Sequence, residues 1–364
     1  MPIYMDLHIV PGVKAKEAAE AHRLDILIEQ EHHCKCMTYW IDEARGHVFC
    51  LIDAPDEEAV IAMHHEAHGL VPYKIIEVQS SIVESFLGRI SDPPETEKTI
   101  DGLAYFNDPA FRVLMVCRVT DPVMLQYQLG KEKAAELVLC HRGIINEQMV
   151  LHDGREVSYP GPAFVGSFTS ADNALACAMA ITRLSGEEST AFLNLKIGLH
   201  GGEPLTANAD FFQKTVDVAE RICFISGKLI IGVSSTVREL IYKSFEPDGL
   251  VFVLTPGHES LMSSCFSILE KNWQNADFQI DDFSRAMSMS RSRLYRKITA
   301  MCRYTPNTLL QFFRLEKARE HMSKCLDNVS SVTYHSGFSS PSYFTKCFKK
   351  RYHIAPHTYL SLMK

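Results

Sequence analysis

Two short helix–turn–helix patterns follow one another in the last ninety or so residues, and this repeat limits the fold more than any other feature. The first covers residues 280–298 and the second covers residues 329–350. A helix expected over Asn307 to Cys325 would hold them in a fixed relation. In each pattern a polar turn precedes a helix whose apolar residues recur at helical spacing, so that one side is buried. The segment is therefore expected to be helical throughout.

In the first pattern, Ser290 is a suitable N-cap, because its hydroxyl can accept a hydrogen bond from the free N–H groups of the first turn. Leu294 and Ile298 fall one turn apart and are expected to face the core. The other side carries the polar and basic residues, which are Arg291, Ser292, Arg293, Arg296 and Lys297. A recognition helix in the major groove contacts bases with exposed side chains near its N-terminus.

In the second pattern, Pro341 fits the first helical position behind Ser340, where the missing N–H costs nothing. Phe344 and Phe348 are expected to face inward. The exposed polar and basic residues around this helix are Ser340, Ser342, Lys346, Lys349 and Lys350. We expect Lys346, like Arg293, to read base edges, because such side chains pair well with guanine.

The charge balance indicates a nucleic-acid partner for this segment. Residues 271–364 hold 16 Lys and Arg against 6 Asp and Glu, which leaves 21 basic and 38 acidic side chains in the rest of the chain. A basic segment on an acidic body suits the phosphate backbone of double-stranded DNA. Arg296, Lys349 and Lys350 are expected to contact phosphates.

The C-terminal segment resembles the DNA-binding domain of the AraC/XylS family of transcription regulators. The matching stretches are 289–297, 314–318 and 337–350, followed by Pro356 and Tyr359. The resemblance implies a double helix-turn-helix that binds operator DNA. Thr333 and His353 stand where the family usually has alanine and glycine, and both affect packing more than DNA contact.

The first 79 residues follow the order strand, helix, strand, strand, helix, strand. The apolar period changes between two and 3.6, with breaks at Pro11-Gly12, 42–46 and Gly69. That order is the split βαββαβ pattern of an α+β ferredoxin-like fold.

Eight of the sixteen histidines lie in this N-terminal segment. His64 and His68 are four residues apart on one expected helix and so share a face. Imidazole together with thiolate suits nickel, copper or zinc. The predicted ligands of a transition metal ion are His8, His22, Cys50, His64 and His68. Packed, hydrogen-bonded side chains are the alternative, and a thiol redox sensor built on Cys34, Cys36 and Cys50 is another.

The same segment resembles a family of small ferredoxin-like domains described as nickel-binding. The matching stretches are Tyr4-Met5-Asp6-x-His8, Ala21-His22-x-x-Asp25, Phe49-Cys50-Leu51 and residues 64–69. The resemblance implies a metal-binding sensor and favours nickel over copper or zinc. His33 and Cys34 depart from the family pattern.

Residues 111–255 resemble the α/β catalytic fold of class III nucleotidyl cyclases, in stretches such as 112–119, 154–164 and 196–202. Arg118 and Pro162 stand where this family has the two aspartates that hold catalytic metals. Neither residue can ligate magnesium, so no catalytic magnesium and no enzymatic activity are expected. Ser158 replaces the purine-reading lysine.

Two roles remain open for a cyclase-like domain without its metals. The head-to-tail pairing of the family implies that it joins two chains in a homodimer, which is the favoured role. Alternatively, Arg118 and Arg221 bind an anionic effector such as a nucleotide. Residual cyclase activity is a third reading.

The expected organisation is multidomain: residues 1–84 as sensor, 85–110 as linker, 111–255 as cyclase-like domain, 256–272 as linker and 273–364 as DNA-binding domain. No run reaches the roughly 20 apolar residues of a spanning helix, and the N-terminus lacks a signal-peptide pattern. The eleven cysteines form no closely spaced framework, which suits a reducing compartment. A cytoplasmic location with no membrane partner is therefore expected.

Overall fold

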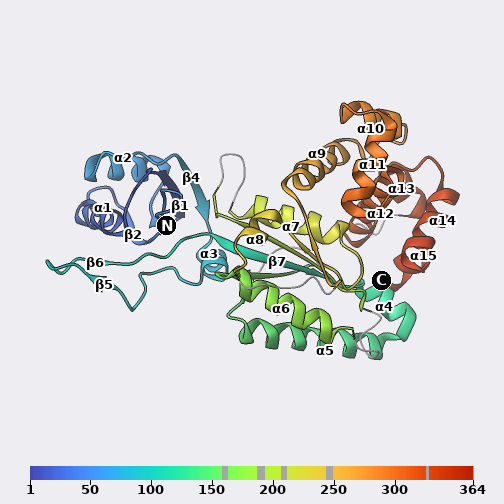
Figure 1. The fold of residues 1–364 in the computed structure, drawn as a ribbon, viewed down its shortest axis with the longest axis horizontal. Helices are drawn as coiled ribbons and strands as arrows, with labels where there is room; N and C mark the ends of the chain where they lie inside the picture. Colours follow the sequence, from blue (N-terminus) through green and yellow to red (C-terminus); the bar gives the residue numbers. More distant parts are fainter. Residues whose placement is uncertain (158–162, 187–192, 206–210, 243–248, 325–327, 364) are drawn as a thin grey trace.

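A computed structural model describes residues 1–157, 163–186, 193–205, 211–242, 249–324 and 328–363. An N-terminal α+β unit, a middle unit built on a larger sheet and a helical C-terminal unit follow one another along the longest axis of the molecule (Figure 1). This order confirms the expected multidomain fold class. Among the described residues, none of the helices has the length and apolar character that crossing a bilayer requires.

The N-terminal unit is a four-stranded antiparallel sheet in the order β2-β3-β1-β4. Its strands are β1 (Ile3–Ile9), β2 (Lys35–Asp42), β3 (His47–Asp53) and β4 (Lys74–Val78). Helices α1 (Ala15–Ile28) and α2 (Glu57–Ala67) make the two connections expected for a split βαββαβ unit. Asp56 caps α2, because its carboxylate accepts a hydrogen bond of 2.9 Å from the backbone N–H of Ala59.

The two faces of this sheet bury different partners, because successive side chains of a strand point to opposite faces. On β1, Tyr4 belongs to the core under α1 and α2. Met5 and Leu7 belong to a second core, which also contains Phe86 of helix α3 (Ser80–Leu87) and Val116 of the middle unit. The N-terminal sheet therefore lies between its own helices and a core that it shares with the middle unit.

Residues 85–110, expected as a linker, instead pack along the N-terminal sheet. They contain the end of α3 and the short strands β5 (Glu97–Lys98) and β6 (Ala104–Tyr105). The guanidinium of Arg89 lies 4.5 Å from the Trp40 ring and donates a hydrogen bond to the Tyr39 carbonyl. Phe106 stacks on the Tyr39 ring at 4.3 Å. The prolines at 93 and 94 are typical of a connector, and local sequence pattern does not reveal these tertiary contacts.

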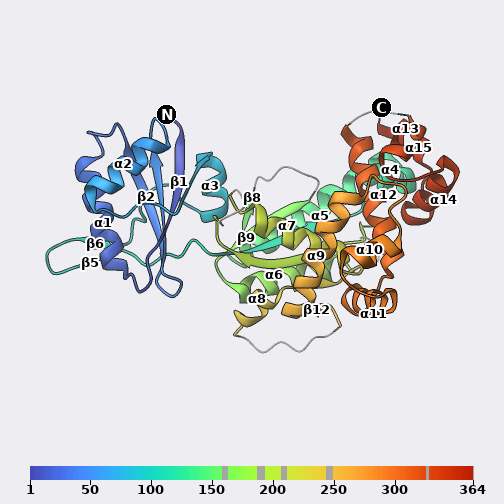
Figure 2. The same cartoon turned by 90° about the horizontal axis from the view of Figure 1, so that it is seen from above.

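The middle unit is a six-stranded sheet in the order β12-β11-β10-β7-β9-β8. Its strands are β7 (Arg112–Arg118), β8 (Arg155–Val157), β9 (Phe164–Phe168), β10 (Lys196–Gly202), β11 (Ile231–Val233) and β12 (Val251–Val253). The helices are α4 (Pro122–Leu129), α5 (Lys131–Leu151), α6 (Ala171–Leu184), α7 (Gln213–Ile225) and α8 (Ser235–Glu239). Helices α5 and α6 cover one face of the sheet, and α7 covers the other (Figures 1 and 2). Ser158 and Pro162 lie outside the described residues.

The C-terminal unit is helical, as expected. Its elements are α10 (Ile280–Ala286), α11 (Arg291–Cys302), α12 (Pro306–Lys324), α13 (Val329–His335), α14 (Pro341–Tyr352) and α15 (Pro356–Met363). The pairs α10–α11 and α13–α14 are the two helix-turn-helix units, and α12 is the long helix between them.

Residues 256–272, also expected as a linker, form helix α9 (Pro256–Asn272). Thr255 caps this helix by accepting a hydrogen bond from the His258 N–H at 3.2 Å. Phe266 and Leu269 are buried in the same core as Leu294 of α11. This segment is therefore part of the C-terminal core, because it presents an apolar side that the first helix-turn-helix unit covers.

A buried ion-pair network joins α12 to the end of β7. The Glu316 carboxylate accepts hydrogen bonds from Arg118 at 3.0 Å and from Arg319 at 2.8 Å, and Arg319 also donates to Asp121 at 2.6 Å. Burial alone would raise the pKa of Glu316, but Arg319 and Arg118 outweigh it and lower the pKa to about 2. The second half of the C-terminal unit is thus held against the middle unit through Glu316.

We expect Glu316→Gln to destabilise this junction, because it leaves two buried guanidinium groups with a weaker partner. The loss should be roughly 3 kcal/mol, as for other broken buried pairs. Glu320→Gln is the matched control: Glu320 pairs with Lys317, both are partly exposed, and the loss should stay within about 1 kcal/mol. Differential scanning calorimetry of the full chain measures both, and equal melting temperatures for the two variants would contradict the assignment.

Candidate metal centre and nucleic-acid interface

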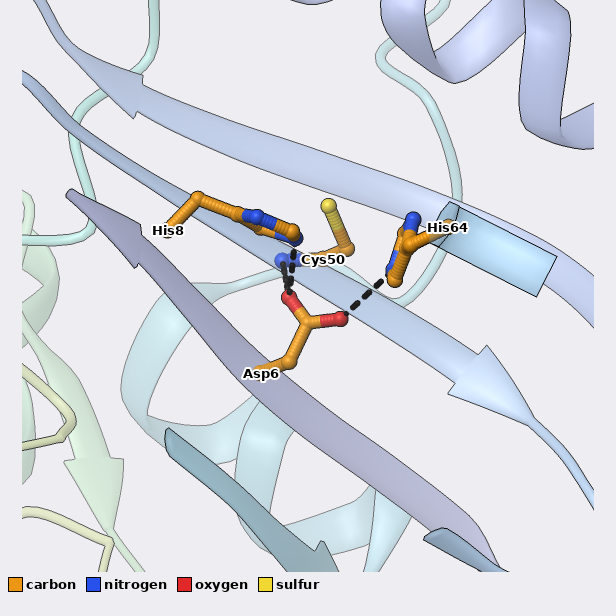
Figure 3. Close-up of side chains that lie close together, drawn as sticks. All are labelled: Asp6, His8, Cys50 and His64. Atoms are coloured by element: carbon orange, nitrogen blue, oxygen red, sulfur yellow. Dashed lines mark hydrogen bonds and ion pairs between the residues drawn. The ribbon is translucent and has the colours of Figure 1, made fainter. Parts of the chain in front are cut away.

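Two groups of metal-type donors lie under α1 and α2, and they share one residue. The first group is Asp6, His8, Cys50 and His64, and the second is Asp25, His64 and His68. Within each group, one donor atom per residue lies within 4.8 Å of the others. Figure 3 shows the first group, in which the side chains from two strands and one helix point toward one another.

Strand geometry brings the first group together. Asp6 and His8 are two residues apart on β1, so both point toward the helices. Cys50 pairs directly with Asp6 across the β1–β3 ladder and therefore faces the same side. Its backbone N–H donates to Oδ1 of Asp6 at 3.1 Å. His64 reaches the same point from α2, on which it is fully buried.

Each nitrogen of the His64 ring faces a different carboxylate. Nε2 lies 2.8 Å from Oδ2 of Asp6, and Nδ1 lies 3.0 Å from Oδ1 of Asp25. Nε2 of His68 lies 3.2 Å from that Asp25 oxygen and 3.3 Å from Nδ1 of His64. The buried ring of His64 is therefore the point at which the two donor groups meet.

The carboxylates require a positive charge between them. Burial alone would lower the pKa of His64, but Asp6 and Asp25 outweigh it and raise the pKa to about 10. Burial would likewise raise the pKa of Asp6, yet His8 and His64 hold it well below its ordinary value. Without a metal ion, His64 is thus an imidazolium between two carboxylates. Burial keeps the Cys50 thiol protonated by raising its pKa well above the ordinary value.

The residues present fit a transition metal ion. Nε2 of His8 is buried without a hydrogen-bond partner among the described residues, and it lies 3.5 Å from Oδ1 of Asp6. A buried ring nitrogen that is left unsatisfied is costly unless a ligand completes it. Imidazole, carboxylate and thiolate together match ions such as nickel, copper and zinc.

Four of the five predicted ligands, His8, Cys50, His64 and His68, lie in these two groups. His22 does not belong to either group and packs instead against the Tyr39 ring at 5.1 Å. Sequence reasoning missed Asp6 and Asp25. The strand alternation that places His8 also places Asp6, and this signal could have found it.

Cys34 and Cys36 also lie outside both donor groups. The Cys34 thiol contacts the His32 carbonyl at 3.5 Å, and the Cys36 thiol contacts the Met63 sulfur at 3.8 Å. Burial raises the pKa of Cys34 to about 11. Because the thiolate is the reactive form, these surroundings do not favour the thiol redox sensor that was left open.

The residues predicted to contact DNA lie on the surfaces of α11 and α14. Most are exposed, and only Lys297 and Ser340 are half-buried; the set is Arg291, Ser292, Arg293, Arg296, Lys297, Ser340, Ser342, Lys346, Lys349 and Lys350. Ser290 and Ser340 cap the two helices, as expected. Arg291 forms an ion pair with Asp281 of α10, so part of its charge is already neutralised within the chain.

Arg118 and Arg221 are not available to an anion in the way that was expected. Arg118 is paired with Glu316 at 3.0 Å and with Glu220 at 3.7 Å. Arg221 is paired with Glu270 of α9 at 3.0 Å. The two guanidinium groups and Lys317 line a cavity of about 220 Å³ together with five carboxylates, so negative charges outnumber positive ones and disfavour an anionic effector. These arginines instead attach α12 and α9 to the middle unit.

Comparison with known families finds matches in the N-terminal and C-terminal units. Residues 4–78 match the family of nickel-responsive proteins that are like SCO4226, and residues 283–361 match the helix-turn-helix domain family. The N-terminal unit is thus an SCO4226-like domain and the C-terminal unit is an AraC-type helix-turn-helix domain, which confirms both expected resemblances.

Individual similar proteins cover separate parts of the chain. The crystal structure of SCO4226 from Streptomyces coelicolor is 31% identical, with a TM-score of 0.20, over 21% of this chain and 94% of that one. The histidine kinase P4 of Formosa agariphila is 38% identical over 28% of this chain and 7% of that protein. A bacterial light-regulated adenylyl cyclase is 12% identical, with a TM-score of 0.33, over 67% of this chain and 88% of that one.

Further curated relatives are helix-turn-helix transcriptional regulators that are 28% to 32% identical over 80 to 88 residues. The chain spans 7% to 32% of the length of the first three curated relatives.

The raised pKa of His64 predicts how the metal-free protein responds to pH. A group whose pKa is higher in the folded state stabilises that state below its unfolded value near 6.5, and this stability is lost as the pH rises through about 10. We expect the N-terminal unit to lose on the order of a few kcal/mol across this range.

Unfolding with chelator present, followed by Trp40 fluorescence in a Trp273→Phe background, measures this loss. His64→Gln should remove the pH slope. His32→Gln is the control, because His32 pairs with the exposed Glu66, and it should keep the slope. The same slope in both variants would rule out His64 as its source.

Proposed function

We propose that this protein is a DNA-binding transcription regulator whose DNA affinity responds to a transition metal ion held by the N-terminal domain, with nickel favoured over copper or zinc. One observation carries the proposal: β1 presents Asp6 and His8 to the donor groups on one face and Met5 and Leu7 to the core shared with the middle unit on the other. A change at the donors therefore acts on a strand that is part of the interface between units.

The C-terminal unit supports the DNA-binding part of the proposal. Helix α11 exposes Arg291 and Arg293 in its N-terminal turn, where a recognition helix contacts bases, and α14 exposes Lys346 in its second turn. The excess of basic over acidic residues in 271–364 supplies the attraction to phosphates. The relatives named as transcriptional regulators are similar to the chain over a length that corresponds to this unit.

The donor groups support the metal-dependent part. Asp6, His8, Cys50, His64, His68 and Asp25 are the residues that would hold the ion. When bound, the ion supplies the positive charge that the two buried carboxylates require. The ligands come from β1, β3, α1 and α2, so binding would tie both helices to the sheet more firmly than the proton on His64 does.

A continuous set of contacts leads from the donors to the DNA-binding helices. The shared core runs from Met5 to Val116 on β7, and the same strand ends at Arg118, which holds Glu316 of α12. Helix α12 in turn fixes the two helix-turn-helix units relative to each other. Coupling between two such sites is typically worth ~1–3 kcal/mol.

Pairing of two chains through the middle unit is part of this proposal, because a homodimer would present two DNA-binding units in a fixed relation. The end of β7 and one side of α7 already contact α12 and α9 of the same chain. The second chain would therefore bind elsewhere on the middle unit.

We expect metal to change the DNA affinity of the full chain by roughly 5- to 150-fold. An operator obtained by selection from a random DNA pool would be titrated with and without Ni²⁺, Cu²⁺ or Zn²⁺, and sedimentation velocity of the complex would count the chains. The double variant His64→Gln/His68→Gln should lose the response, whereas His32→Gln should keep it. An affinity that stays constant across the titration would refute metal control and leave DNA binding untouched.

We expect Arg293→Ala to lower affinity for the selected operator by roughly 1–3 kcal/mol and to change binding to random DNA little, because a base-reading side chain contributes to specificity. Arg285→Ala is the control. Arg285 is also exposed but lies on α10, paired with Asp282, and its loss should leave both affinities unchanged. Equal losses on operator and random DNA would assign Arg293 to phosphate contact instead.

A further inference from the structure

The two donor groups under α1 and α2 share the ring of His64, and each group uses a different nitrogen of that ring. We infer that the N-terminal domain binds two divalent transition metal ions, with His64 bridging them as an imidazolate. This inference rests on the proposed metal binding and specifies how many ions the site takes and how they are connected.

The second group is already spaced like three ligands of one ion. Its donor atoms are Oδ1 of Asp25, Nδ1 of His64 and Nε2 of His68, and the three distances among them are 3.0, 3.2 and 3.3 Å. Ligands held at about 2.0–2.1 Å from one ion stand roughly 3 Å apart. An ion on this triangle therefore needs little movement of the side chains, and it would use Nδ1 of His64.

The first group lies on the other side of the ring. Oδ2 of Asp6 is 2.8 Å from Nε2 of His64, and Nε2 of His8 and the sulfur of Cys50 complete the group (Figure 3). The His8 side chain is buried, and its Nε2 has no hydrogen-bond partner within the described part of the chain. An ion here would satisfy this nitrogen, and it would use Nε2 of His64.

A single ion with Asp25 as an outer partner is the competing arrangement. A histidine that ligates through one nitrogen commonly donates its other N–H to a carboxylate, and Asp25 is placed to accept it. That arrangement needs no further donor, yet Nε2 of His68 converges on the same point. Two ring nitrogens and a carboxylate oxygen in one triangle form a ligand set rather than an orienting hydrogen bond.

Charge balance also permits two ions in this buried site. Bridging requires that both ring nitrogens of His64 lose their protons and that the Cys50 thiol loses its own, all of them to solvent. The imidazolate, the thiolate, Asp6 and Asp25 then carry four negative charges, which two divalent ions balance. A single divalent ion with the Cys50 thiol still protonated would balance Asp6 and Asp25 alone, so the ligand geometry, and not the charge, favours two ions.

The test loads the full chain anaerobically with Co²⁺, counts ions by native mass spectrometry, and compares the electron paramagnetic resonance intensity per ion with that of a mononuclear reference. We expect about two ions per chain and an intensity per ion reduced by exchange through the bridge. One ion at saturation overturns the inference, and so do two ions with full intensity. No bound ion overturns the proposed metal control itself, so the two failures are distinguishable.

Variants at the edge of the second group assign the two ions. Asp25→Asn and His68→Gln should each leave about one ion, with the intensity per ion restored. His22→Gln is the matched control, because His22 is buried on the same helix as Asp25 but lies outside both donor groups, and it should keep two coupled ions. Loss of both ions in His68→Gln, with its melting temperature unchanged, would place His68 in a single shared site and overturn the inference.

Discussion

The N-terminal unit depends on the charge balance around two buried carboxylates. Asp6 and Asp25 both lie beneath the helices, where an unpaired negative charge would be very unfavourable. In the metal-free protein, the imidazolium of His64 balances them, since each of its nitrogens faces one of the two. The positive charge of the protonated His64 ring lies between the two carboxylates, where a bound cation would also lie. The same charge balance that stabilises the metal-free fold therefore also brings the donor side chains close to one another.

Because Asp6 and His8 lie on β1, this site is connected through that strand to the middle unit. Both faces of β1 are buried: one holds the donors, and the other packs against α3 and the middle unit. The middle unit in turn holds α12 through Arg118 and Glu316. Arg118, at the end of β7, is thus an attachment point for the C-terminal unit.

Local pattern was sufficient for much of the fold. The alternation along β1 and the caps at Ser290 and Ser340 predicted elements that the structure contains, because period and capping act within a few residues. Local pattern was insufficient to predict the structure of segments 85–110 and 256–272. Both segments resemble connectors by themselves, and what orders them is contact with a distant surface, such as Arg89 on Trp40 or Phe266 in the core of α11.

The sequence by itself determined which side chains share a face: Asp6 with His8, His64 with His68, and the basic residues of α11 and α14. Side-chain periods of two and 3.6 are properties of the backbone and need no tertiary information. Only the tertiary structure decided which faces meet. It placed Asp25 rather than His22 beside His64, and it paired Arg118 and Arg221 with carboxylates of α12 and α9. The physical reason is that these contacts join elements far apart in the chain, whose relative positions are set by packing of the whole core.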